Sequence, residues 1–264
     1  MRWRTTVIAG VVLLAAALAF AQGRRYGNAM DALRTYRPEA NIPYDGKFAF
    51  VRVSYETAPG GYWYRGQPAW MHGYPDAEHN MLRILDALTT VAPHVDASNT
   101  LSLDDPEIFK YPLIYMIEMG WWEMTDSETL ALRTYLDKGG FIIVDDFKPP
   151  GVNGGGGWEL FAANMARVKA DAEFVDLDVS HPIFKQFFDI QSLDIVPQAY
   201  VSGRPVFRGL HRNNDPQEPL QMMVFYNTDI SQFWEWSERG LRSIEDTNEA
   251  YKLGVNAILY GLTH

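Results

Sequence analysis

Apolar residues alternate with polar ones, or form short continuous runs, in several segments that predict β-strands. Residues 48–55, FAFVRVSY, alternate large apolar side chains with small or polar ones. Residues 112–119, PLIYMIEM, and 141–144, FIIV, are almost entirely apolar, as expected of strands that are covered on both faces. Two shorter strands are predicted over 100–103 and 222–226. These runs indicate a sheet with a buried centre.

Apolar residues at helical spacing lie between these strands and predict helices. The first helix is predicted from about 76 to 90, with acidic residues in its first turn. The second begins at TDSE, residues 125–128, a capping box in which the hydroxyl and the glutamate satisfy free amides of the first turn. It ends before the glycine pair at 139–140. Two more helices are predicted over 158–168 and about 247–263.

The alternation of strands and helices predicts an α/β protein with right-handed crossovers and a mainly parallel sheet. Beyond Glu173 the pattern loosens into short pieces. The chain shows no internal repeat and no linker, so we interpret residues 47–264 as one α/β domain.

The N-terminus has the features of a secretory signal peptide. Basic residues at 2 and 4 precede an uncharged apolar stretch at 7–20, and a small-x-small cleavage site precedes Gln22. We therefore predict a signal peptide over 1–21, a polar leader over 22–46, and export to the periplasm or the extracellular space. The alternative is an uncleaved anchor, although a spanning helix needs about 20 apolar residues. No later segment is long and apolar enough to cross a bilayer, so we expect no membrane span after cleavage.

Charge and cysteine content exclude several classes of function. A formal net charge of -10 and a pI near 5.0 disfavour nucleic acid and anionic membranes as partners, because both require a basic surface. The chain has no cysteine, which excludes disulfides, thiolate nucleophiles, thiolate zinc sites and iron–sulfur ligation. We predict no cofactor.

The glycine-rich segment GVNGGGGW, residues 151–158, follows the strand ending in Asp145 and Asp146. It has neither the Gly-Lys-Ser/Thr ending of a P-loop nor the G-x-G-x-x-G spacing of a dinucleotide fold. The two aspartates also place negative charge at its mouth, so a phosphate site is disfavoured. Two interpretations stay open, a simple turn and a loop that closes over a ligand.

Ligands of parallel sheets bind beyond the carboxyl ends of the strands, and here these ends form an acidic rim. Such a rim can hold a divalent cation, grip a hydroxyl-rich ligand or supply paired carboxylates. The alternative is that these acids cap helices. Neighbouring strand residues point to opposite faces, so at most one of Asp145 and Asp146 should face a given site while the strand persists. The acidic candidates for ligand binding are Glu118, Asp145, Asp146 and Asp229.

Histidine and aromatic residues add two further candidates. The histidines lack H-x-H, H-x-x-x-H and H-E-x-x-H spacing, so we predict no metal site. His72, in the aromatic loop after the first strand, and Trp158, beside the glycine-rich segment, complete the set of ligand-binding candidates. No G-x-S-x-G motif occurs, and we assign no catalytic residue.

Taken together, several motifs resemble those of the bacterial domain of unknown function 4159 over about four fifths of the chain. They are YP-x-AE at 74–78 after the Trp-rich loop, DPEIFKYP at 105–112, LDKGGFIIVDD at 136–146, HPIF at 181–184, NTD at 227–229 with WE at 234–235, and GVNAILY at 254–260. That family looks related to the class I glutamine-amidotransferase-like group. The resemblance implies a flavodoxin-like three-layer α/β sandwich with a mainly parallel sheet.

The resemblance does not imply amidotransferase activity. Catalytic members of the larger group keep a cysteine at a sharp turn after a central strand, whereas the corresponding turn here reads EMGW, residues 118–121. We therefore expect a non-catalytic binding or assembly module of the bacterial cell envelope, with an envelope protein or glycan as partner. One alternative is a hydrolase of envelope glycans or peptides that uses paired carboxylates or a metal. Another is a structural partner domain whose cleft is vestigial.

Overall fold

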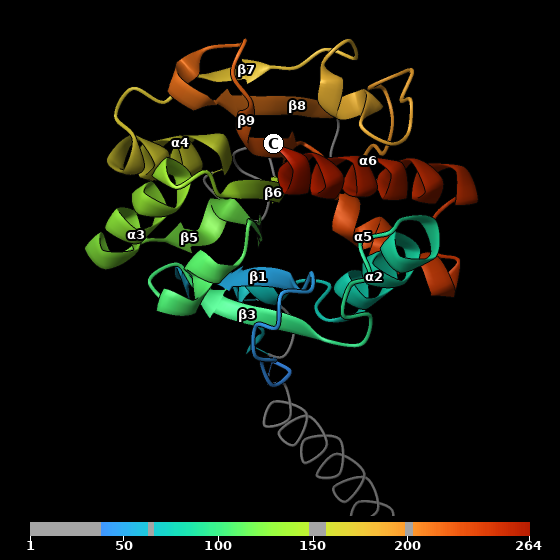
Figure 1. Cartoon of the computed structure of the whole chain (residues 1–264), viewed down its shortest axis with the longest axis horizontal. Helices are drawn as coiled ribbons and strands as arrows, with labels where there is room; N and C mark the ends of the chain where they lie inside the picture. The colour runs from blue at the N-terminus through green and yellow to red at the C-terminus, as the bar shows by residue number, and fades with distance from the viewer. Residues whose placement is uncertain (1–37, 63–65, 148–156, 199–202) are drawn as a thin grey trace, which may run out of the picture. The chain divides into compact units, whose positions relative to one another are not determined.

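The computed structural model describes residues 38–62, 66–147, 157–198 and 203–264 (Figure 1). The predicted signal peptide and most of the glycine-rich segment lie outside these ranges, so the predictions for them stay predictions. The helices and strands described below belong to one compact unit, Pro38–Tyr62 with Pro68–His264.

A seven-stranded sheet forms the centre of this unit, in the order β3-β1-β4-β6-β9-β8-β7. The first five strands in that order are parallel and the last two are antiparallel to their neighbours. Numbered along the chain, the parallel strands lie in the order 2-1-3-4-5, which is consistent with a flavodoxin-like fold. The strands are β1 (Phe50–Ser54), β3 (Ser98–Ser102), β4 (Leu113–Ile117), β6 (Phe141–Phe147), β7 (Phe174–Asp176), β8 (Val206–His211) and β9 (Leu220–Tyr226). Two short strands, β2 (Glu56–Thr57) and β5 (Trp122–Glu123), form a separate antiparallel pair.

Helices cover both faces of the sheet (Figure 1). On one face lie α2 (Asp76–Leu88), α5 (Ile230–Glu235) and α6 (Ile244–Thr263), and on the other lie α3 (Asp126–Asp137) and α4 (Gly157–Val168). Short 3-10 helices connect these elements: η2 (Ala69–Met71), η3 (Pro106–Lys110), η4 (Met119–Trp121), η5 (Pro182–Lys185), η6 (Arg212–Asn214) and η7 (Ser237–Arg239).

Strand β4 shows why the central segments are apolar throughout. Leu113, Tyr115 and Ile117 pack in the core beneath α2, α5 and α6. Ile114 and Met116 pack in the core beneath α3 and α4. Because alternate side chains enter opposite cores, a strand in this position has no solvent-exposed face.

The mixed α/β architecture with a mainly parallel sheet is confirmed. Each strand and helix predicted up to residue 168 is present, and the capping box is formed, with the Thr125 amide donating to Glu128 Oε2 at 2.8 Å. The sequence pattern missed β7 and α5, which are short, and β8, which lies between β9 and the edge strand β7. Within the described residues, no helix has both the length and the hydrophobicity needed to cross a bilayer.

Candidate functional site

Three side chains from separate parts of the chain meet beyond the carboxyl ends of β4 and β6. His72 lies between β1 and α2, Glu118 directly follows β4, and Asp146 lies near the end of β6. His72 Nδ1 is 3.0 Å from Asp146 Oδ2 and 3.5 Å from Glu118 Oε1. One ligand atom from each residue lies within 4.8 Å of the others. We call this group the His72 triad.

The His72 triad lies where the strand order reverses. The chain runs outward from β1 to β3 and then returns to place β4 on the other side of β1. The crevice at such a switch point is the usual ligand site of open α/β sheets, because the connections on its two sides diverge. The side chain of His72 is 25% exposed, whereas those of Glu118 and Asp146 are 2% and 0% exposed. The histidine is therefore the accessible member of a largely buried group.

The backbone is left-handed at both acidic members of the triad. Glu118 has φ 55° and begins the turn into η4, and Asp146 has φ 54°. Non-glycine residues in this region cost about 1–3 kcal/mol each. At Asp146 the pairing of β6 with β9 also shifts register between Val144 and Phe147. The strand is thus irregular where the two aspartates lie.

Only one of the two neighbouring aspartates joins the His72 triad, in keeping with the expectation that at most one of them faces a given site. Asp146 contacts His72, while Asp145 accepts hydrogen bonds from the Tyr115 hydroxyl at 2.7 Å and the Ser231 amide at 2.9 Å. The two carboxylates therefore have different hydrogen-bond partners but lie close enough to influence each other electrostatically.

Asp145 and Asp229 are buried near the triad and cap α5. Asp145 Oδ1 accepts from the Ile230 amide at 3.1 Å, and Asp229 Oδ1 accepts from the Gln232 amide at 2.9 Å. For these two residues the structure shows the capping role that was the alternative to ligand binding. Asp145 and Asp229 therefore influence the triad through their charges and hold the first turn of α5 in place.

The electrostatics of this region favour a bound proton. Burial, together with the negative charges of Asp229 and Asp146, raises the pKa of Asp145 to about 7, against the hydrogen bonds from Tyr115 and the Ser231 amide. Burial alone would lower the pKa of His72, but its hydrogen bonds to Asp146 and Glu118 outweigh burial and raise that pKa well above its usual value. The two carboxylates therefore favour the protonated form of His72.

A buried arginine in β1 holds the backbone of His72. Arg52 Nη1 donates to the carbonyl oxygens of Trp70 at 2.9 Å and His72 at 2.8 Å. Its Nε donates to Glu78 in α2, and both side chains of this ion pair are buried. The sequence interpretation missed Arg52, although a charged residue in the middle of the apolar segment FVRVS was a signal that it needs a buried partner.

Tyr55 holds the turn at Glu118 in a similar way. Its hydroxyl lies 2.9 Å from the carbonyl oxygen of Ile117 and 2.8 Å from that of Glu118. The ring is buried beside the end of β1. The sequence interpretation missed this residue as well, since a tyrosine at the end of a strand has no distinctive pattern.

The remaining polar residues at the strand ends and Trp158 have structural contacts. Asp104 accepts from the Ser102 and Ser127 hydroxyls, and Asp105 caps η3. Trp158 packs at the start of α4 against Phe161, Phe174 and Tyr226, with the guanidinium of Arg208 lying 4.1 Å from its ring centroid.

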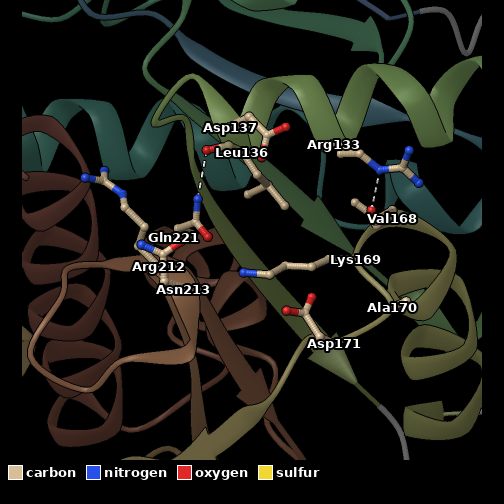
Figure 2. A pocket seen from close by; sticks show the side chains of 10 residues that line it. All are labelled: Arg133, Leu136, Asp137, Val168, Lys169, Ala170, Asp171, Arg212, Asn213 and Gln221. Carbon is tan, nitrogen blue, oxygen red and sulfur yellow. Dashed lines mark hydrogen bonds between the residues drawn. The ribbon is translucent and has the colours of Figure 1, made fainter.

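A cavity of about 610 Å³ lies away from the triad, near the amino end of strand β9 (Figure 2). Gln221 in its wall is at the start of β9, whereas Asp146 is near the end of β6, and the two strands are parallel. Figure 2 shows Gln221 donating to the Leu136 carbonyl and Arg133 donating to the Val168 carbonyl, at 2.8 and 2.6 Å. These bonds satisfy carbonyls at the ends of α3 and α4, so Arg133 and Gln221 have structural roles in this wall.

Comparison with known proteins places the chain in a family. No curated protein is detectably similar to it. The model of a family described as a domain of unknown function, DUF4159, matches residues 49–262. The match spans most of the chain and includes the His72 triad and Arg52. The chain therefore belongs to the DUF4159 family of domains of unknown function.

Proposed function

We propose that the protein is an exported binding or assembly module of the bacterial cell envelope, and that the His72 triad contacts its ligand. The observation that carries the proposal is the convergence of His72, Glu118 and Asp146 at the switch point of the sheet. Export rests on the signal peptide predicted over residues 1–21, and its ligand is an envelope protein, peptide or glycan.

The proposal places the module on an amidotransferase-like sandwich without that group's nucleophile. The parallel strand order supports the likeness. So does the left-handed Glu118 at the turn after β4, the position where the resemblance expects a cysteine in catalytic members. Because the chain has no cysteine, thiolate attack on glutamine has no reacting atom.

The geometry favours a binding module over a hydrolase that acts with two carboxylates alone. Retaining glycosidases keep their two carboxyl groups about 5–5.5 Å apart and inverting ones about 6.5–9.5 Å, and in both the groups must reach the scissile bond from either side. In the His72 triad the ligand oxygens of Glu118 and Asp146 lie within 4.8 Å, and both side chains are buried. Asp145 and Asp229 cap α5 and do not line an open aromatic cleft.

A thermal-shift screen of the purified chain against cell-wall peptides and glycans tests the binding role. A ligand at about 100 times its Kd stabilises the native state by about 2.7 kcal/mol. The shift should be lost in Asp146→Asn and in Glu118→Gln, and kept in Glu107→Gln, which removes an exposed carboxylate from η3. Equal shifts in all four proteins would refute the site, and recovery of the chain only from the cytoplasm would refute export.

A further inference from the structure

The geometry points to the His72 triad as a binding site for one divalent ion of the first transition series. This inference rests on the proposed function, because it names an ion that the triad binds before it contacts the envelope ligand. Three donor atoms from His72, Glu118 and Asp146 gather within 4.8 Å.

The spacing fits the edges of a coordination shell. Zinc–nitrogen and zinc–oxygen bonds of about 2.0–2.2 Å place neighbouring ligand atoms about 3.0–3.5 Å apart in tetrahedral or octahedral geometry. His72 Nδ1 lies 3.0 Å from Asp146 Oδ2 and 3.5 Å from Glu118 Oε1. Two of the three edges therefore have the right length already. A rotation of the flexible Glu118 side chain adjusts the third edge, which is within 4.8 Å.

The donor set selects the class of ion. One imidazole nitrogen with two carboxylate oxygens suits ions from manganese to zinc. Calcium and magnesium prefer shells made entirely of oxygen, and copper(I) prefers sulfur, which cysteine does not supply here. Metal binding uses the lone pair of His72 Nδ1, so a proton held at that atom passes to solvent when the ion binds.

The fold holds each ligand in place without the ion. Arg52 fixes the carbonyl of His72, Tyr55 fixes the carbonyl of Glu118, and the irregularity in β6 directs Asp146 toward His72. Such outer contacts orient metal ligands and contribute to affinity. The exposed edge of His72 indicates the side from which water or a further ligand reaches the ion. Three protein ligands with an open side are the arrangement of a site that exchanges ligands.

Metal titration of the purified, chelator-treated chain tests the inference, using isothermal titration calorimetry and metal analysis after equilibrium dialysis. Zn²⁺, Mn²⁺ and Co²⁺ are the probes, and Mg²⁺ and Ca²⁺ are the comparison ions. We expect one transition-metal ion per chain. Asp146→Asn and Glu118→Gln should each weaken binding by at least about 100-fold. The Asn substitution suits the left-handed backbone of Asp146, and far-UV circular dichroism checks the fold of both variants.

His94→Gln is the matched control, because it removes a histidine that also contacts a carboxylate, Asp45 at 3.1 Å. The dissociation constant of this variant for the ion should stay within about threefold of the wild-type value, since His94 and Asp45 lie outside the triad. Bound Co²⁺ should also give visible absorption bands in wild type that are absent in the two triad variants. This readout reports coordination directly and does not depend on stability.

The outcomes separate this inference from the proposed function. Absence of transition-metal binding in wild type, or equal binding in wild type and both triad variants, overturns the metal site. If a cell-wall ligand still shifts the melting temperature of wild type but not of the variants, the proposed function stands without a metal. If neither metal binding nor ligand binding changes in the triad variants, both proposals fail.

Discussion

Replacing Glu78 by glutamine should destabilise the protein by about 3 kcal/mol, because the charge of Arg52 then stays buried without a facing carboxylate. The two side chains are 0% and 1% exposed. Removing one partner of a buried ion pair costs about 3–5 kcal/mol. The lower end applies here, since Arg52 keeps its hydrogen bonds to two carbonyls and lies 5.3 Å from the ring centroid of Tyr115.

The pair itself contributes less than this loss implies. Burial raises the pKa of Glu78 even with Arg52 beside it, so taking the carboxylate out of water outweighs the attraction that it gains. The Arg52→Met/Glu78→Gln double variant leaves neither charge buried. It should therefore be more stable than the sum of the single effects predicts, by about 2 kcal/mol.

Equilibrium unfolding in urea, followed by tryptophan fluorescence and far-UV circular dichroism, measures these differences. Glu238→Gln is the matched control, since Glu238 pairs with Arg83 at the surface, where the two side chains are 69% and 51% exposed, and it should change stability by less than about 1 kcal/mol. A Glu78→Gln protein as stable as this control would refute the reasoning. Arg52→Met should also weaken metal binding by about 10–100-fold, because Arg52 positions His72 without touching the ion.

Two further predictions concern pH and helix capping. Burial and the neighbouring His211 lower the pKa of His181 from 6.5 to about 4, so the unfolded chain binds more protons between these values and stability falls as pH drops from about 6.5 to 4. A shift of this size corresponds to a loss of stability of at most about 3 kcal/mol, which partial exposure of His181 reduces to about 1–2 kcal/mol. His181→Asn should flatten the fall of the melting temperature between about pH 6.5 and 4. An unchanged pH profile in this variant would contradict the assignment. Thr125→Ala removes the hydroxyl that caps α3 and should cost about 1 kcal/mol in urea unfolding. Thr134→Ala, within the same helix, should change stability by less than about 0.5 kcal/mol, and equal losses would contradict the capping role.

The parts of the fold that were predictable are those in which one physical requirement fixes the sequence. Strands β4 and β6 are covered on both faces, and only a continuous apolar run meets that requirement. A capping box in the sequence marks the start of helix α3. In contrast, β7 and α5 are held by the neighbours that they pack against, and they are too short to show a period of their own.

The convergence of the candidate residues was partly predictable from the sequence, but its geometry was not. The rule that ligands bind beyond the carboxyl ends of parallel strands brings Glu118 and Asp146 into one region, and His72 follows the first strand along the chain. The angle at which the side chains meet depends on the register shift in β6, and no local residue pattern marks that shift. The partner of Arg52 depends on how α2 packs, so the sequence shows that a partner is needed without showing that it is Glu78.

The backbone at the strand ends gives a physical reason to connect the His72 triad with binding. Glu118, Asp146 and Asn227 follow or end three adjacent strands, and all three are left-handed, with φ of 55°, 54° and 55°. Asparagine and aspartate tolerate this region, whereas a glutamate carries a cost that glycine would avoid. The turn after β4 therefore does not require a carboxylate. The turn alone does not explain the glutamate side chain, and its 3.5 Å approach to His72 supports the proposal that Glu118 belongs to a ligand site.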